Sequence, residues 1–283
     1  MKTIDIIIPV HNQYSSLCKC LYAFNLQNLD KAQFFITIVD DGSTDELADK
    51  SWNDLSIKYD LTGQIIRQLN KGRAAARNVG IEAAKSDIVI FCDADRFPKK
   101  DFIQQHLEFH ENGAEIVIGA SYDYFGKWEY VSKTDINWDI VLKYSRLSSY
   151  FKNISCIYNS KGQTVSKLAW LSFLVGNLSV KKSILADAGM FDETFVEWGF
   201  EHFEIAYRMW LKGYHFSLNK LAANYHIPHR RDNNFYVESI AKNASFMCKK
   251  HPEIKNEILS DFVSGKIGIN LAEYNMYKEQ IDE

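Results

Sequence analysis

The sequence lacks several features that would assign a protein to a broad class at once. No apolar run approaches the roughly 18 residues needed to cross a membrane, and the charged start Met1–Asp5 is not typical of a signal peptide. The net charge of −3 provides no basic surface for nucleic acid. Five scattered cysteines show no zinc-ligand spacing. We therefore expect a cytoplasmic protein with reduced thiols, and leave open contact with the inner face of the membrane through a lipid-linked substrate.

Apolar runs and helical patterns alternate through the first 120 residues. Short buried runs predict strands at Ile4–Val10, Phe34–Val39, Gln64–Gln68 and Asp87–Cys92. Between them, helical spacing predicts helices at Gln13–Leu26, from Thr44-Asp45 to about Tyr59, and at Arg73–Lys85. Strands and helices in this order predict an α/β fold, with a mostly parallel open sheet flanked by helices.

The pattern changes in the rest of the chain. Strands are predicted at Glu115–Ala120, Gly176–Val180 and Leu221–Tyr225, and helices at Lys181–Ala188 and Phe200–Lys212. We found no repeats or low-complexity linkers and therefore favour one compact unit. Its expected parts are a nucleotide-binding half (residues 1–120), an acceptor-side half (121–233) and a helical tail (234–283).

Polar residues follow three of the predicted strands, at Pro9–Asn12, Asp40–Ser43 and Asp93–Asp95. Because open α/β sheets bind ligands beyond the carboxyl ends of their strands, these sets should converge on one crevice. Asp93 and Asp95 could both turn toward a hard cation such as Mg²⁺ or Mn²⁺. An Asp-x-Asp tripeptide also occurs by chance in solvated turns, but its place after a buried strand favours function.

Two arginines, Arg73 and Arg77, lie four residues apart on one face of an Ala-rich predicted helix. They could meet phosphate groups or hold the acidic loops, and ordinary surface arginines are the alternative. Small residues in the same stretch, including Gly80, would let the helix approach its neighbours closely.

Three ordered motifs, Val39–Asp45, Ala76–Gly80 and Asp93–Asp95, together resemble the nucleotide-binding half of family-two glycosyltransferases. Those enzymes have the fold called GT-A, and the resemblance covers about residues 4–120. It implies a UDP-sugar donor carrying galactose, N-acetylgalactosamine or N-acetylglucosamine. It also implies that Asp93 and Asp95 serve the ribose and the metal-bound diphosphate. The expected nucleotide-sugar contacts in this half are Pro9, Val10, His11, Asn12, Asp41, Arg73, Arg77, Asp93 and Ala94.

A second signature begins with Gly176-Asn177 and continues with Trp198-Gly-Phe-Glu-His-Phe-Glu204. It resembles the C-terminal segment of β-1,4-galactosyltransferases, chondroitin-polymerase-type enzymes and polypeptide N-acetylgalactosaminyltransferases. In that segment a Trp-Gly-x-Glu-Asp stretch lies at the acceptor site, and its Asp acts as the base in inverting members. Here His202 replaces that Asp, so either Glu201 or His202 is the expected catalytic base. We also expect Gly176, Asn177 and Trp198 to contact the nucleotide-sugar.

Histidines near the end of the acceptor-side half complete the predicted metal site. In the related enzymes a late His joins the Asp-x-Asp, and both His226 and His229 fit loosely. We favour His226 because it ends a predicted strand. A different pair, His106 and His110, flanks Glu108 at the wrong offset for a zinc motif and is interpreted as part of a helix face.

The sequence thus favours a Mn²⁺- or Mg²⁺-dependent, inverting transfer of a hexose or N-acetylhexosamine to a glycan, lipid-linked or peptide acceptor. A retaining N-acetylgalactosaminyltransferase and a non-catalytic nucleotide-sugar-binding protein remain alternatives. A nucleotidyltransferase or a dinucleotide-dependent oxidoreductase is disfavoured, because the loop at His11–Tyr14 after the first strand has no glycine.

Overall fold

The computed structural model describes residues 4–127, 136–196, 199–227 and 233–280. Its strands are β1 (Ile4–Val10), β2 (Phe34–Asp41), β3 (Gly63–Gln68), β4 (Ile88–Cys92), β5 (Arg96–Pro98), β6 (Ile116–Tyr124), β7 (Ser145–Leu147), β8 (Asn177–Lys181) and β9 (Phe216–His226). Its α-helices are α1 (Tyr14–Asn25), α2 (Trp52–Tyr59), α3 (Arg73–Ala83), α4 (Phe102–Glu111), α5 (Trp138–Lys143), α6 (Ser149–Ile154), α7 (Lys182–Asp187), α8 (Glu201–Leu211), α9 (Asn233–Lys250), α10 (Asn256–Val263) and α11 (Ile269–Tyr277).

All the described strands belong to one mixed sheet, in the order β3-β2-β1-β4-β8-β6-β9-β5, with β7 paired to β6. The first four strands are parallel to one another, as predicted for the first half. Strand β8 then enters antiparallel between β4 and β6, while β9 runs parallel to β6. The α/β fold is confirmed, and the parallel part of the sheet is confined mainly to the first half. The second half is mixed because the chain returns to the sheet from the opposite end through β8.

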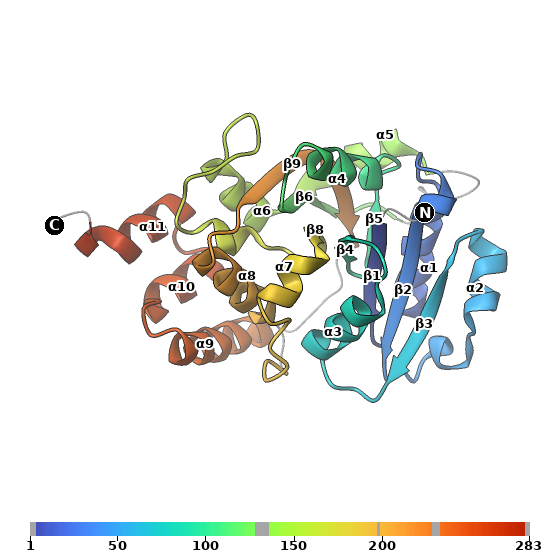
Figure 1. Cartoon of the computed structure of the whole chain (residues 1–283), viewed down its shortest axis with the longest axis horizontal. Helices are drawn as coiled ribbons and strands as arrows, with labels where there is room; N and C mark the ends of the chain where they lie inside the picture. Colours follow the sequence, from blue (N-terminus) through green and yellow to red (C-terminus); the bar gives the residue numbers. More distant parts are fainter. Residues whose placement is uncertain (1–3, 128–135, 197–198, 228–232, 281–283) are drawn as a thin grey trace.

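Helices cover both faces of the sheet (Figure 1). The alternation of side chains along β1 explains the two layers, since successive residues of a strand point to opposite faces. Ile4, Ile6 and Ile8 pack in a cluster with α1, α2 and α4, whereas Ile7 packs in a second cluster with α3, α7 and α8. Strands apolar on both faces are typical of sheets buried between helices.

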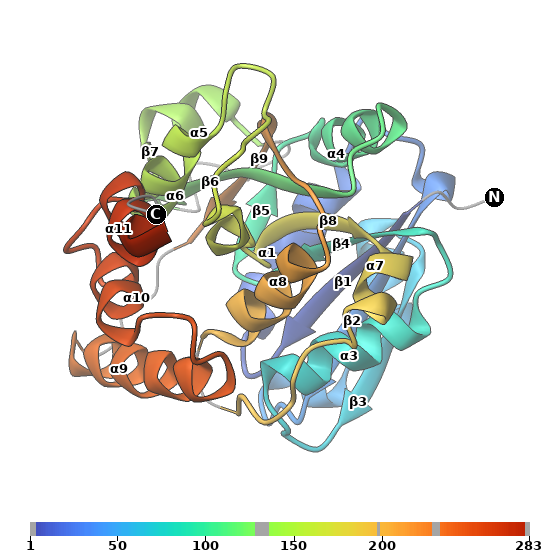
Figure 2. The same cartoon turned by 60° about the vertical axis from the view of Figure 1, so that its left-hand side comes forward.

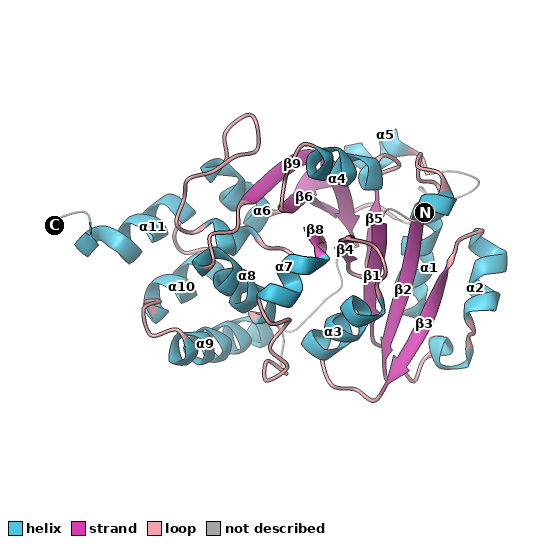
Figure 3. Ribbon diagram, viewed as in Figure 1, coloured by secondary structure: helices cyan, strands magenta, loops and turns pink. Residues whose placement is uncertain are grey.

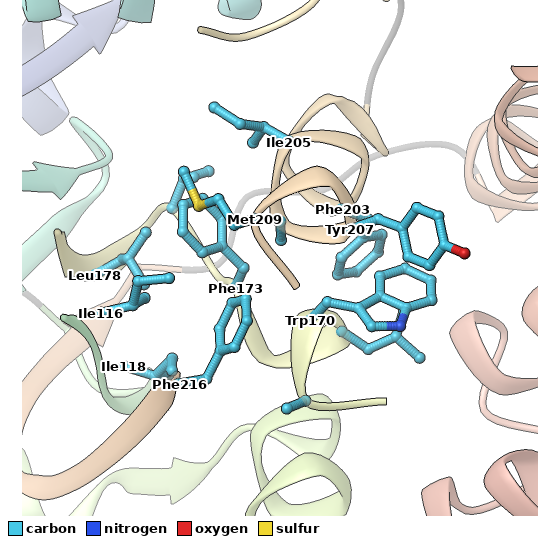
Figure 4. Packing of buried hydrophobic residues seen from close by; sticks show 14 of the residues in the cluster. Ile116, Ile118, Trp170, Phe173, Leu178, Phe203, Ile205, Tyr207, Met209 and Phe216 are labelled. Carbon is cyan, nitrogen blue, oxygen red and sulfur yellow. The ribbon is translucent and has the colours of Figure 1, made fainter. Parts of the chain in front are cut away.

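The second cluster extends from the sheet to the C-terminal helices. Phe203 and Tyr207 of α8 contact the buried indole of Trp170, with ring centroids 6.4 and 5.1 Å away (Figure 4). Met247 of α9 and Phe262 of α10 belong to the same cluster, which joins the tail to the acceptor-side half. Helices α9–α11 form one end of the molecule, opposite α2 and β3 (Figure 1). None of the described helices is both long and apolar enough to cross a membrane.

One predicted helix is divided in two. The sequence pattern predicted a single helix up to Tyr59, but the structure has a 3₁₀ turn at Glu46–Asp49, capped by Asp45, followed by α2. The break occurs because Ser51 and Asp54 form a capping box, in which each side chain accepts a hydrogen bond from the other's backbone. A new helix therefore starts after Ser51.

Candidate active site

A cavity of about 370 Å³ lies beyond the carboxyl ends of β1, β2 and β4, beside the first turn of α3. Figure 3 shows the ends of β2 and β3 pointing toward the side of the sheet where the chain leads into α3. The order of the strands reverses between β1 and β4, which is where open α/β sheets bind ligands. The cavity is lined by Pro9, Val10, His11, Gln13, Asp41, Asn70, Gly72, Arg73, Ala76, Arg77, Asp93, Asp95 and Val196. The predicted convergence of the three polar strand ends is therefore present.

Asp41 holds the loop that leads into α3. Its Oδ1 accepts hydrogen bonds from the Lys71 N–H (2.8 Å) and the Gln68 side-chain amide (2.7 Å). Its Oδ2 accepts one from the Gly72 N–H (2.9 Å). A carboxylate oxygen can accept two hydrogen bonds, so Oδ2 keeps one acceptor position, and Asp41 is among the residues that line the cavity. Asp41 can thus anchor the loop and also bind a ligand.

The end of β1 is tied to the loop after β2. His11 Nδ1 lies 2.9 Å from the carbonyl oxygen of Asp41, which leaves the imidazole at the cavity wall. Asn12 is not among the residues that line the cavity, but it supports the contact between His11 and the Asp41 loop. Its N–H donates to Ser43 Oγ (2.9 Å), and its Oδ1 accepts from the Thr44 N–H (2.7 Å). Asn12 therefore braces the end of β1, and it is not among the residues that line the cavity.

Arg77 connects the two signature regions of the sequence. Its guanidinium is 2% exposed and donates to Glu201 Oε1 at 2.7 Å and to Asp93 Oδ1 at 3.3 Å. Asp93 Oδ2 lies 3.8 Å from the Nε of Arg96 on β5, so two arginines flank this carboxylate. Arg73, one turn earlier on α3, is exposed and lines the cavity. Of the two predicted arginines, Arg77 holds acidic side chains and Arg73 is available to a phosphate.

Glu201 and His202 begin helix α8 and lie next to this arginine. Burial opposes ionisation of Glu201, yet the adjacent His202, Arg77 and Arg73 together hold its pKa below the usual range of a glutamate. The ion pair with Arg77, at 2.7 Å, is one of these contributions. Glu201 Oε2 and His202 Nδ1 lie 3.7 Å apart, and neither buried atom has a hydrogen-bond partner among the described residues.

Asp95 and His226 form the second polar group of the site. His226 Nε2 lies 3.5 Å from Asp95 Oδ2, and His226 Nδ1 lies 3.0 Å from Asp123 Oδ1. Burial lowers the pKa of His226, but its contacts with Asp123 and Asp95 outweigh burial and raise it. Within the described ranges, no group of three or more His, Cys, Asp and Glu is gathered closely enough to hold a metal ion. His229 lies outside the described residues.

Two predicted contacts from the β4 and β8 motifs, Ala94 and Asn177, have other surroundings. The methyl group of Ala94 is buried in the cluster with α1 and α4, because alternate residues of this segment turn inward. Asn177 is 1% exposed and donates to the carbonyl oxygens of Ala120 and Ala222, so its amide joins strands and does not line the cavity. Gly176 does lie at the site, since a Cβ there would be 2.8 Å from Asp93 Oδ2. Trp198 lies outside the described residues.

Several residues of the site were not among the predicted contacts. Gln13, Asn70, Gly72, Ala76 and Val196 line the cavity, while Arg96 and Asp123 hold Asp93 and His226. Asn70 and Gly72 precede the predicted Arg73 helix, so the sequence held a local signal for them. No local sequence signal pointed to Val196, because it reaches the cavity from a loop more than a hundred residues further along the chain.

Three comparisons relate the chain to known proteins. The family model described as "Glycosyl transferase family 2" matches residues 5–169. The uncharacterized glycosyltransferase YfnE of Bacillus subtilis is 27% identical to this chain, over 89% of the chain and 71% of its own length. The validoxylamine A glucosyltransferase of Streptomyces hygroscopicus is 25% identical, over 90% of the chain and 62% of its own length.

A similar fold occurs in a solved structure. Staphylococcus aureus TarS, residues 1–349 in complex with UDP-GlcNAc, superposes with a TM-score of 0.64. The match covers 99% of this chain and 80% of that chain, at 15% sequence identity. At such low identity the comparison concerns the arrangement of strands and helices.

Proposed function

The chain belongs to glycosyl transferase family 2 and has the GT-A fold, and from that premise we propose that it transfers a hexose or N-acetylhexosamine from a UDP-sugar to an acceptor hydroxyl. The observation that carries the proposal is the cavity at the β1–β4 reversal, with Asp41, Asp93 and Asp95 on its wall and Arg73 at its edge. The UDP-GlcNAc bound to TarS supports the same class of donor. Glycan, lipid-linked and peptide acceptors are all compatible with this proposal.

Asp95 and His226 together offer two ligand atoms to a divalent cation. His226 contacts a carboxylate with Nδ1 and directs Nε2 toward Asp95, an arrangement typical of metal-binding histidines. Asp95 and His226 would hold Mn²⁺ or Mg²⁺, and Asp93, flanked by Arg77 and Arg96, would instead face the ribose or the sugar. When bound, the cation supplies positive charge that stabilises the departing diphosphate.

His202 is the base that we favour. Glu201 is paired with the buried Arg77 and has a lowered pKa, which makes its carboxylate a weak proton acceptor. A small movement would close the 3.7 Å gap, so that the His202 Nδ1–H donates to Glu201 Oε2. Nε2 would then be free to accept a proton, and the adjacent carboxylate would stabilise the imidazolium that forms.

The proposed reaction is a single displacement. The acceptor hydroxyl loses its proton to His202 Nε2, and its oxygen forms a bond to the anomeric carbon. The bond between that carbon and the diphosphate oxygen breaks on the opposite face. UDP leaves with both electrons, while Arg73 offers it positive charge. The anomeric carbon is therefore inverted.

The variant His202→Ala tests this assignment. Turnover should fall by about 10²–10⁴-fold, the usual contribution of a general base, while the dissociation constant of UDP stays within about twofold because the base does not contact the nucleotide. A panel of UDP-sugars with Mn²⁺ and mixed acceptors, followed by NMR of the product, gives rate and anomeric configuration together. His215→Ala, at a histidine whose side chain is 86% exposed, is the matched control.

Undiminished turnover of His202→Ala would exclude this base, and retention of configuration would exclude the single displacement. Asp95→Asn should remove the stimulation by Mn²⁺. Full activity of Asp95→Asn in EDTA would exclude the metal assignment.

A further inference from the structure

A second cavity adjoins the proposed donor cavity along one wall. It has a volume of about 350 Å³, within the range of about 300–1,000 Å³ that ligand pockets occupy. Its lining residues are Thr194, Phe195, Val196, Lys242, Asn243, Ser245, Phe246 and Lys249. Val196 lines both cavities. Figure 2 shows the loop between α7 and α8 passing between α3 on one side and α9 on the other. One loop thus separates the two cavities.

Apolar side chains form part of this second cavity. The rings of Phe195 and Phe246 meet edge to face, with centroids 4.8 Å apart, and the side chain of Val196 is 67% exposed. Lys250 lies over both rings and forms an ion pair with Asp192, so its charge is already balanced. An apolar surface with a few polar groups at its edge is typical of small-molecule sites.

Both charged residues in the described lining of this cavity are lysines. They are Lys242 and Lys249, and no carboxylate is among the described residues that line it. Lys249 is exposed and has no ion-pair partner among the described residues. Two acids just before the lining residue Thr194 have other partners, since Asp192 pairs with Lys250 and Glu193 accepts a hydrogen bond from Asn78. A concave surface lined by positive charge concentrates anions.

We propose that this second cavity is the acceptor subsite, and that it takes an anionic group of the acceptor, either a carboxylate or a phosphate diester. The inference rests on the proposed function and names its acceptor class. Because Val196 belongs to both walls, an anion bound beside Lys249 would place the neighbouring hydroxyl of the same acceptor toward the donor cavity. The loop also leads directly to Glu201 and His202, which begin α8.

Isothermal titration of the full chain, with UDP and Mn²⁺ present, tests the inference. Three probes are compared: a hexuronate-containing tetrasaccharide, a short glycerol-phosphate oligomer and a neutral hexosamine tetrasaccharide. At least one anionic probe should bind more tightly than the neutral one, and added salt should weaken it. Lys249→Gln should raise its dissociation constant about two- to fivefold, as for one exposed charge pair, and Lys249→Glu should raise it further. The probe that binds distinguishes a carboxylate from a phosphate.

Lys266→Gln is the matched control, because Lys266 is an exposed lysine outside the cavity. Equal binding of all three probes, or no effect of Lys249→Glu on an anionic probe, would overturn the inference. UDP binding, measured first in the same cell, would remain intact in that case and would keep the proposed function. Failure of UDP to bind would instead overturn the proposed function, together with the inference that rests on it.

Discussion

Arg77 is the side chain through which the two halves of the candidate site meet. It reaches Glu201, 124 positions later in the chain, and also Asp93 after β4. A buried charge is tolerated only when it is paired, and the loss of one partner leaves the other charge without compensation. Arg77 therefore fixes the start of α8 relative to the Asp93–Asp95 segment.

Replacing Arg77 with methionine should destabilise the protein by about 3–5 kcal/mol, because Glu201 would stay buried without its partner. The free energy of unfolding in urea measures the effect. The double variant Arg77→Met/Glu201→Met should recover a large part of the loss, since no unpaired charge remains. Arg73→Met, at the exposed arginine of the same helix face, should cost less than about 0.5 kcal/mol. A double variant no more stable than Arg77→Met would contradict this account.

At the scale of elements, helix α3 lies unusually close to strand β1. A Cβ on Gly80 would stand 2.4 Å from Ile7 Cγ2, closer than two carbon atoms can approach without movement. Ile7 is fully buried, so it has little room to yield. The contact holds α3, the helix that carries Arg73 and Arg77, closely against β1.

Gly80→Ala should therefore destabilise the protein by about 1–3 kcal/mol, as overpacking of a core does. Helix propensity alone predicts the opposite sign, a gain of about 1 kcal/mol. Urea unfolding distinguishes the two. In an Ile7→Ala background the added methyl group meets no obstacle, so the same substitution should become neutral or stabilising there. A loss of equal size in both backgrounds would show that Ile7 is not the cause.

At the scale of the whole molecule, buried histidines connect the two halves of the chain. His106 and His110 of α4 both lie 2.8 Å from Ser179 Oγ on β8, and His106 Nε2 lies 3.0 Å from Asn177 Oδ1. Both histidines are buried, with 0% and 6% of their surface exposed. They lie on the helix face that we had interpreted as structural because the spacing around Glu108 does not match a zinc motif. Burial lowers the pKa of His106 to about 3 and that of His110 to about 4.

Stability should consequently fall as the solution becomes acidic. In the unfolded chain both histidines take up protons near pH 6.5, whereas in the folded chain they remain neutral until about pH 4 or below. The contribution is fully present above pH 6.5 and decreases below it, because the unfolded state then binds more protons. Between about pH 6 and pH 5 the slope should approach 2.5 kcal/mol per pH unit. Urea unfolding at several pH values measures it.

The double variant His106→Gln/His110→Gln should flatten this part of the curve, whatever its absolute stability. His215→Gln, at an exposed histidine, should leave the slope unchanged. Equal slopes for the native chain and the double variant would refute the assignment.

Much of the fold was predictable because its cause is local. The alternation of short apolar runs and helical patterns located β1–β4, α1 and α3 to within a few residues. The start of a new helix after Ser51 also has a local cause, since the capping-box residues Ser51 and Asp54 are visible in the sequence. The helical pattern on both sides of Ser51 nevertheless led us to predict one continuous helix. Strand β9 was predicted only over Leu221–Tyr225 and begins at Phe216, because its first half lacks a continuous apolar run.

The sequence by itself determined the polar ends of the strands. Asp41, Asp93 and Asp95 must come together once parallel strands lie side by side, because the carboxyl ends of such strands share one edge. Their residue types also favour a cation and a nucleotide. Conclusions of this kind depend only on the order of elements and on the chemistry of single residues.

Only the tertiary structure decided what each side chain touches. The pairing of Arg77 with Glu201, the inward turn of Ala94 and Asn177, and the place of Val196 between two cavities join residues from distant parts of the chain. Hydrophobic periodicity states which face of an element is buried, but not which neighbour covers it. That neighbour is set by how the sheet and its helices pack, and here packing assigned Arg77 to the acids of the site and left Arg73 at the cavity edge.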